Sequence, residues 1–270
     1  MAWFGDTKKG RIGTFFRNDP TMAGYWQLNG SSVDNSGNNN NGTDTAILYG
    51  QSGALKNSSS INLNGSTSKI VIPDNSILKP STHFSVIFWF KTIQVDPANS
   101  PTYFQSYSQP ATVAGFEIQQ NATLSTLRFV VGKNSGTVLA TDYQEVFANN
   151  KFNDGRWHCA CFVHNNGVGI SIYVDGVLSG SVAWTGGVAY AATNYVRIGC
   201  NNLSGTDQFF VDGNMSEVSL FSRALSAQEI SQYYRWATSG KRSLSLNPEL
   251  MISYTTLPVG TNNMALLGVT

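Results

Sequence analysis

Ionic side chains are scarce in this sequence of 270 residues. Asp, Glu, Lys and Arg make up 12% of it, about half of the roughly 25% that is usual in globular proteins. The 17 basic and 16 acidic residues leave a net charge of +1. Binding to nucleic acid or to an anionic membrane through charge requires a basic surface, so we expect no nucleic-acid partner and no membrane partner. Surface polarity must come from the abundant amide and hydroxyl side chains instead.

Long apolar segments and a cysteine framework are also missing. No apolar run approaches the roughly 20 residues of a membrane-spanning helix. The first residues, MAWFGDTKKGRIG, lack the apolar centre of a secretory signal, so we expect synthesis in a cytoplasm without export by the general route. The three cysteines, Cys159, Cys161 and Cys200, are odd in number and irregular in spacing, which argues against a disulfide scaffold and favours small buried residues.

The sequence contains no recognisable catalytic motif. Retaining glycoside hydrolases need two carboxyl groups about 5–5.5 Å apart, which alternate residues of one strand can supply. None of the glutamates forms such an alternating pair with another carboxylate; they are Glu117, Glu145, Glu217, Glu229 and Glu249. There is no G-x-S-x-G, H-E-x-x-H or Gly-Lys-Ser/Thr phosphate loop. We therefore predict no catalytic residues, and only a site assembled from distant strands would escape this argument.

Short runs of β-type sequence, separated by Gly and Asn, occupy most of the chain. Residues 84–92, FSVIFWFKT, are apolar on both faces, which is typical of a central strand. Asp175-Gly176 lies between two apolar runs and predicts a type I′ hairpin turn. Residues 45–59 are predicted to be coil. Further short strands are expected near residues 25–29, 60–65, 69–73, 103–107, 115–120, 127–132, 137–141, 156–164 and 194–200.

One helix is predicted near the end of this strand-rich region. Ser226 and Glu229 form a capping box, in which each residue can bond the backbone N–H of the other. Ile230, Tyr233 and Tyr234 follow at helical spacing. The sequence therefore predicts an all-β domain that closes with one short C-terminal helix.

Several motifs in order resemble the laminin G-like (concanavalin A-like) jelly-roll domains, specifically their bacterial and viral branch. They include Y-W-Q-L-N at 25–29, D-x-S-G-N-x-N-x-G at 34–42, R-W-H-C-A-C-F-V-H at 156–164, Y-V-D-G at 173–176 and F-x-D-G-x-x-x-E-V-x-L-F-x-R-A-L-S-x-x-E-I at 210–230. The resemblance implies a two-sheet antiparallel jelly-roll sandwich over residues 24–236. Residues 1–23 would then form an N-terminal arm and residues 237–270 a C-terminal extended arm.

The resemblance also implies a possible structural calcium ion. Some relatives hold calcium between the Asn-rich loop and the last strand, where carboxylate and amide oxygens suit this ion. The corresponding ligands here would be Asp34, Asn39, Asn41 and Glu217. Ser216 stands where the family has a second carboxylate. The alternative is a loop whose side chains bond its own backbone. No other cofactor is expected.

Two functions are compatible with these observations. The first is a non-enzymatic virion protein, such as a bacteriophage capsid decoration, fibre or baseplate component. Its arms, residues 1–23 and 240–270, are rich in aromatic or apolar residues and would bind other virion proteins or copies of itself; it would reside in the virion after synthesis in the host cytoplasm. The alternative is a carbohydrate-binding lectin module that stacks glycan rings on exposed aromatic side chains, for which the candidates are Tyr103, Tyr107, Trp184 and Tyr190.

Overall fold

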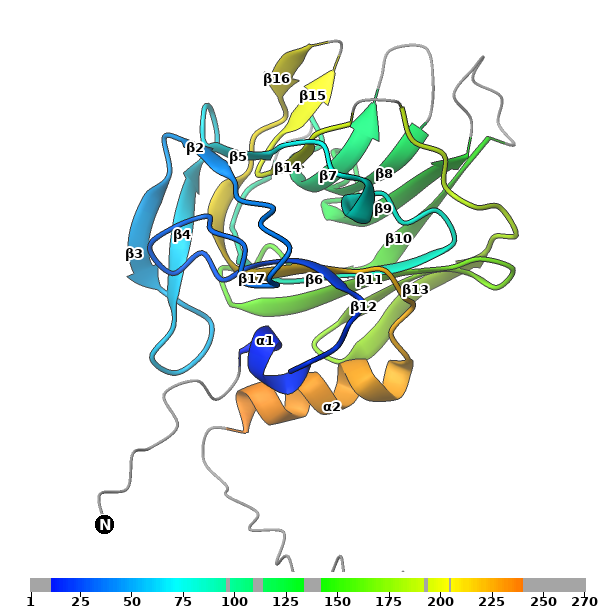
Figure 1. The fold of residues 1–270 in the computed structure, drawn as a ribbon. Helices are drawn as coiled ribbons and strands as arrows, with labels where there is room; N and C mark the ends of the chain where they lie inside the picture. The colour runs from blue at the N-terminus through cyan, green and yellow to red at the C-terminus, as the bar shows by residue number, and fades with distance from the viewer. Residues whose placement is uncertain are drawn as a thin grey trace, which may run out of the picture. The chain divides into compact units, whose positions relative to one another are not determined.

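Two antiparallel β-sheets pack face to face, and helices lie against the outer face of one sheet (Figure 1). This computed structural model describes residues 11–95, 98–108, 114–133, 142–191, 194–203 and 205–239. Within these ranges the architecture is an antiparallel jelly-roll sandwich with one short C-terminal helix, which confirms the predicted fold class. No helix in them is both long and apolar enough to pass through a bilayer.

The strands divide between two large sheets and one small hairpin. Sheet A contains, in spatial order, β13 (Val177–Ala183), β12 (Gly169–Val174), β11 (His158–Asn165), β6 (His83–Lys91), β17 (Asp212–Phe221), β4 (Ser59–Asn64) and β3 (Leu48–Ser52), while β1 (Met22–Trp26) also pairs with β17. Sheet B contains β10 (Tyr143–Lys151), β9 (Thr126–Lys133), β8 (Ala114–Gln120), β7 (Thr102–Ser108), β14 (Val196–Ile198), β5 (Lys69–Ile72) and β2 (Thr43–Thr45). The hairpin is β15 (Asn201–Leu203) with β16 (Thr206–Gln208).

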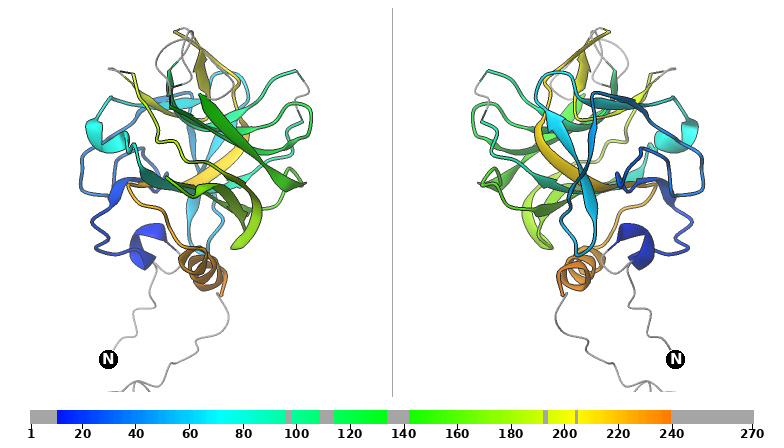
Figure 2. Two further views of the ribbon diagram at one scale, coloured as in Figure 1. Left: turned by 90° about the vertical axis from the view of Figure 1, so that its right-hand side faces the viewer. Right: turned by 90° about the vertical axis from the view of Figure 1, so that its left-hand side faces the viewer.

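Three short helical elements complete the domain. They are α1 (Ile12–Phe15), the 3₁₀ helix η1 (Ser76–Leu78) and α2 (Ala227–Thr238). Both α1 and α2 cover the face of sheet A that points away from sheet B, as the two side views also show (Figure 2).

Strand β6 lies at the centre of sheet A between β11 and β17, as its two apolar faces predicted. Phe84, Val86 and Phe88 pack into the core between the two sheets. Ile87 and Trp89 point to the opposite face and pack into a second core beneath the helices. Both faces of this strand must be apolar because each one covers a separate hydrophobic core.

Two hydrophobic cores, both rich in aromatic side chains, hold the layers together. The inter-sheet core includes Trp26, Phe90, Phe104, Phe116, Phe129 and Phe162, all essentially inaccessible to solvent. The core beneath the helices includes Cys159 and Cys161, which lie on the same face of β11, and all three cysteines are buried and free. The expectation of small buried cysteines is therefore confirmed.

Local signals for the hairpin and the helix are also confirmed. Asp175 and Gly176 have φ values of 53° and 79°, as a type I′ turn requires. At the start of α2, Ser226 N donates to the Glu229 carboxylate at 2.9 Å and Glu229 N donates to the Ser226 hydroxyl at 3.2 Å. The indole N–H of Trp89 donates to Tyr233 Oη at 2.9 Å, which ties the helix to sheet A.

The sequence prediction differs from the structure at strands on or beside the sheet edges. Residues 45–59, predicted to be coil, contain β3, where Leu48 is 57% exposed. β10 was not predicted, and it pairs with β9 from Tyr143 to Lys151. Edge strands bury little apolar surface, so their sequences show weak alternation. The strand expected near residues 137–141 lies outside the described residues.

Glu229 should make stability depend on pH in the acid range. Its bonds from the Arg223 guanidinium and from Ser226 lower its pKa to about 2. Because the pKa is lowered on folding, this stabilisation is complete above the unfolded pKa and is lost as the pH falls from about 4.5 towards 2. Urea unfolding of wild type between pH 2 and 6 should show this loss.

Glu229→Gln keeps a side chain that can accept the capping bond but removes the charge, so its stability should change less over that window. The control is Asp212→Asn, which alters an exposed carboxylate that has no ion pair with any residue that the structure describes. Identical pH profiles for wild type and Glu229→Gln would contradict the assignment.

Candidate functional site

Residues 11–23 dock on this chain's own sandwich. Phe15 packs against Tyr233 and Trp236 of α2, with ring centroids 5.6 and 5.4 Å apart. Phe16 packs edge-on against Phe221 of β17 at 4.9 Å. The part of the predicted N-terminal arm that the structure describes is therefore a structural layer of the domain; residues 1–10 lie outside the described residues.

Glu217 joins this N-terminal segment to sheet A. It lies on β17, where the pairing with β6 is irregular between Ser216 and Ser219, and its φ is 55°. Its side chain is 0% exposed. Arg11 Nη1 donates to Oε1 at 2.6 Å, while Ile12 N and Tyr25 Oη donate to Oε2 at 3.0 and 2.5 Å. Burial raises the pKa of this carboxyl, and the bonds from Tyr25 and Arg11 oppose that rise.

Asp34 organises the Asn-rich loop by accepting bonds from its backbone. Oδ1 accepts the N–H groups of Tyr25 and Ser36 at 3.0 and 2.9 Å, and Oδ2 accepts the N–H of Asn40 and the hydroxyl of Ser36, both at 2.9 Å. The N–H of Asp34 donates to Asn41 Oδ1 at 2.9 Å. The loop therefore has the self-bonded form that was the alternative to a metal site.

The four predicted calcium ligands do not surround a common point. Asp34 binds the backbone N–H of Tyr25, whereas Glu217 binds the hydroxyl at the other end of the same side chain. Asn39 is exposed and has a φ of 58°. In the part of the chain that the structure describes, no three His, Cys, Asp or Glu residues gather as a metal site. These residues do not fit a shared calcium ion in this arrangement, and calcium binding stays a prediction.

The aromatic residues predicted to stack on glycans are separated. Tyr103 is 1% exposed, and its ring packs against Phe88 and Phe90 at 5.6 and 5.2 Å, so it belongs to the hydrophobic core rather than to an exposed platform. Trp184 is buried with Lys133 Nζ 5.3 Å from its ring centroid.

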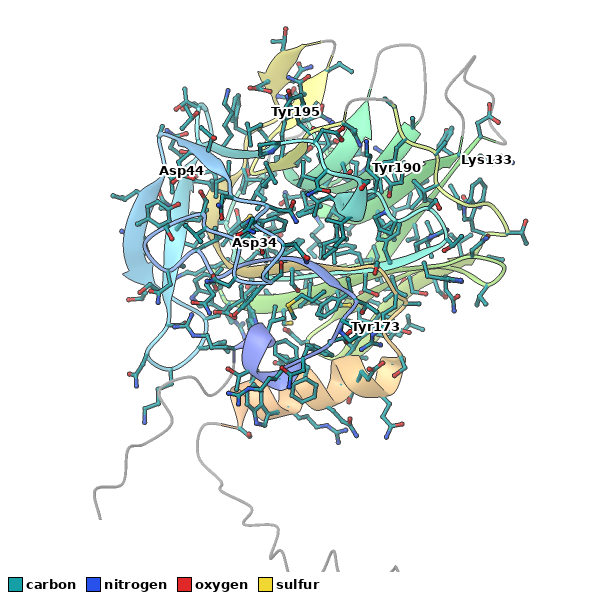
Figure 3. The ribbon with its side chains drawn as sticks, in the orientation of Figure 1. Asp34, Asp44, Lys133, Tyr173, Tyr190 and Tyr195 are labelled. Carbon is teal, nitrogen blue, oxygen red and sulfur yellow. The ribbon has the colours of Figure 1, made fainter. Side chains whose placement is uncertain are left out.

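Of the remaining two rings, the structure describes only that of Tyr190. Tyr190 is half-buried and donates its hydroxyl to Pro80 O at 2.9 Å; it lies far from Asp34 (Figure 3). The side chain of Tyr107 lies outside the described residues. Glycan stacking on these rings stays a prediction.

A cavity of about 560 Å³ lies where the N-terminal segment meets β1 and the loop after β3. Within the part of the chain that the structure describes, no aliphatic side chain lines it. The residues that do are Arg11, Gly13, Thr14, Arg17, Tyr25, Gln27, Asn29, Asn35 and Asn57. A Cβ on Gly13 would approach Tyr25 Cε1 to 2.4 Å, so glycine is needed for the N-terminal segment to lie against this ring.

The backbone around this cavity is strained. Leu28 is fully buried with a φ of 58°, which turns the flanking Gln27 and Asn29 towards the cavity. Asn57 also has a φ of 58°. A left-handed conformation is unusual for leucine, and such strain is often found at functional sites. Gln27, Asn29 and Asn35 stand in the motifs at 25–29 and 34–42, but nothing in the sequence indicated that they share one cavity with Asn57.

The outer face of sheet B carries a second group of polar residues. Strand register places Arg197, Gln105, Glu117, Val130 and Glu145 in one row across five strands. Glu117 is buried and accepts bonds from Thr102 Oγ1 at 3.1 Å and from Asn201 Nδ2; burial raises its pKa.

The ionic groups in this row already have partners. Arg197 Nε binds Asp207 at 3.0 Å, and Arg128 Nε binds Glu145 at 2.7 Å. Val130 separates Glu117 from Glu145 by a whole strand, so their backbones are about 9–10 Å apart. Glu117 and Glu145 are thus each held by a different set of neighbours.

Comparison with known proteins gives one family and one fold. A family model described as "Concanavalin A-like lectin/glucanases superfamily" matches residues 64–231, which is more than half of the chain. No curated protein matches the sequence of this chain.

One similar solved structure is domain 4 of AbnA, a GH43 extracellular arabinanase from Geobacillus stearothermophilus, in complex with arabinotriose. The TM-score is 0.56 and the sequence identity is 22%, and the match covers 79% of this chain and 98% of that chain. The binding domain of Paraclostridial Mosquitocidal Protein 1 is similar with a TM-score of 0.59 and 15% identity, over 75% and 49%. The botulinum neurotoxin DC binding domain in complex with SialylT has a TM-score of 0.60 and 13% identity, over 80% and 51%. This chain thus spans about half of the toxin binding domains, and at these identities the likeness shows the fold alone.

Glu217→Gln should strongly destabilise the protein. It leaves the guanidinium of Arg11 without its partner while Arg11 itself stays buried, and breaking a buried ion pair in this way costs about 3–5 kcal/mol. Urea unfolding at pH 7 measures the loss.

The matched control is Glu145→Gln, which breaks the half-exposed pair with Arg128 and should cost under about 1 kcal/mol. Equal effects of the two substitutions would show that residues 11–17 are not anchored by Glu217.

Proposed function

The chain belongs to the concanavalin A-like lectin/glucanases superfamily, and on that basis we propose that it is a non-catalytic module that binds carbohydrate in the cavity beside the N-terminal segment. The observation that carries this proposal is the polar lining of the cavity. Gln27, Asn29, Asn35 and Asn57 all face it, and none of their side-chain amides is bonded within the described chain. In contrast, Asn38 and Asn40 of the neighbouring loop bond backbone carbonyls.

Such a lining suits a ligand with many hydroxyl groups. An amide side chain offers both a carbonyl acceptor and N–H donors, and a sugar hydroxyl can likewise donate and accept. Sites for apolar ligands are lined mainly by hydrophobic side chains, which this cavity lacks. Its volume of about 560 Å³ lies within the roughly 300–1,000 Å³ typical of small-molecule sites.

A binding role is supported over a catalytic one by the charges at the cavity. Glycoside hydrolysis generally requires two carboxyl groups with different roles. Among the described residues that line the cavity there is no Asp or Glu. The nearby Glu217 is fully buried and holds Arg11, Ile12 and Tyr25, so it is not available as a general acid or nucleophile.

Removing amides from the cavity should weaken glycan binding without unfolding the protein. A glycan array on wild type identifies a ligand, and calorimetric titration then compares Gln27→Ala and Asn57→Ala with wild type. Each substitution should weaken binding about 2- to 10-fold, because a hydrogen bond contributes roughly 0.5–1.5 kcal/mol net.

The control is Asn150→Ala, at an exposed position on β10 outside the cavity. An array with no bound glycan, or unchanged affinity in both cavity variants, would rule out this site.

A second proposal concerns assembly in a virus particle, as suggested by the bacterial and viral branch of the family that the motifs resemble. One observation favours it. The contact of Phe15 with Trp236 brings α1 and α2 together, so both ends of the described chain leave the sandwich at the same face (Figure 2). Residues 1–10 and 240–270 continue from these ends and contain Trp3, Phe4 and many aliphatic residues. Virion proteins or further copies of this chain would bind through these segments.

Deleting residues 1–10 and 240–270 tests assembly separately from folding. The remaining residues 11–239 retain both hydrophobic cores, so we expect a soluble, monodisperse protein that no longer joins particles or oligomers in sedimentation experiments. Deleting residues 1–23 instead removes Ile12, Phe16 and Met22 from the core beneath the helices, and should unfold the protein. Assembly that survives the first deletion would contradict the proposal.

A further inference from the structure

We propose that the carbohydrate bound in this cavity carries a carboxylate group, as a uronic acid does, and that Arg17 binds this group. The inference rests on the carbohydrate-binding function proposed above and names the class of sugar. It comes from an imbalance of charge at the cavity. Two guanidinium groups line it, and only one of them is neutralised by a residue that the structure describes.

Arg17 is the arginine without a partner among the residues that the structure describes. The Arg11 guanidinium is paired with Glu217 at 2.6 Å. The other described arginines also have partners: Arg128 with Glu145, Arg156 with Asp154, Arg197 with Asp207, Arg223 with Asp19 and Glu229, and Arg235 with the carbonyl oxygen of Ser231. Arg17 is exposed and lines the cavity.

The nearest carboxylate in the sequence is held away from Arg17. Asp19 accepts Arg223 Nη2 at 2.7 Å on one oxygen and the hydroxyl and N–H of Thr21 at 2.6 and 3.0 Å on the other. These bonds from Arg223 and Thr21 help to lower the pKa of Asp19 against the effect of burial. The carboxylate nearest to Arg17 in the sequence is therefore already bound by Arg223 and Thr21.

The backbone that carries Arg17 is firmly anchored. Phe16 is buried against Phe221, and Asp19 N donates to Phe16 O at 3.1 Å in the turn that follows α1. Asn18 adopts a φ of 63° within this turn. The Cα of Arg17 is thus fixed on both sides, while its long side chain is free to reach a ligand.

The chemistry of the cavity favours a carboxylate with one negative charge. A guanidinium binds a planar carboxylate through two parallel N–H···O bonds, which gives both affinity and orientation. Because Glu217 neutralises Arg11, the cavity has a net charge of about +1 from its arginines. The free amides of Gln27, Asn29, Asn35 and Asn57 then remain to bond the hydroxyl groups of the same sugar.

Pairs of sugars that differ only at C6 provide the test. D-glucuronate and D-galacturonate are titrated into the full-length protein beside D-glucose and D-galactose, with binding followed by ligand-observed NMR and calorimetry. We expect each uronate to bind about 10- to 100-fold more tightly than its neutral partner, as expected for a charge-assisted pair. Higher salt should reduce this difference.

Arg17→Ala should bring the affinity for each uronate down to that of its neutral partner, and Arg17→Lys should restore only part of the difference. The control is Arg156→Ala, at an arginine that is 82% exposed and outside the cavity. Thermal unfolding of each variant shows that the fold is intact.

The outcomes separate this inference from the function on which it rests. Equal binding of neutral and acidic sugars, weakened by Gln27→Ala, would overturn the carboxylate and keep the carbohydrate site. Equal binding of glucuronate and glucose 6-sulfate would overturn the preference for a carboxylate. An uronate preference that survives in Arg17→Ala would overturn the role of Arg17. If neither these sugars nor any arrayed glycan binds, both proposals fail.

Discussion

The buried carboxylate of Glu217 connects the N-terminal segment to the rest of the domain. An isolated charge in a protein interior costs several kcal/mol of desolvation, even after relaxation. Strand β17 cannot satisfy this charge by itself. Two of its three donors, Arg11 Nη1 and Ile12 N, come from residues 11–12, and the third is the Tyr25 hydroxyl. Order in the N-terminal segment and burial of Glu217 therefore depend on each other.

The same segment forms one wall of the cavity. Gly13, Thr14 and Arg17 approach from this side, while Gln27 and Asn29 follow β1 on the other. The segment also packs on α2 through Phe15, so the helix and the segment form one continuous layer over sheet A. A ligand in the cavity would contact this layer and the sandwich at once, and its affinity would depend on the bonds to Glu217.

Features that depend on a few neighbouring residues were predicted well. The Asp175-Gly176 turn and the Ser226 to Glu229 capping box are determined by local backbone preferences and short-range bonds. The central position of β6 followed from its two apolar faces. β3 and β10 were missed because edge or near-edge strands bury less apolar surface, and register with a neighbour rather than their own pattern defines them.

The sequence by itself determined the fold class, because alternation of apolar residues, turn residues and a helix cap each act over a short stretch of chain. The candidate site was decided only by the tertiary structure. Arg17, Gln27 and Asn57 have no common motif, and it is folding that brings them to one cavity. The surroundings of Asp34, Glu217 and Tyr103 also appear only in the tertiary structure, because a carboxylate can bind a cation, a guanidinium or backbone N–H groups, and a tyrosine can lie on the surface or in the core. What each one contacts depends on which groups folding brings within bonding distance, and for Glu217 the partner Arg11 is 206 positions away.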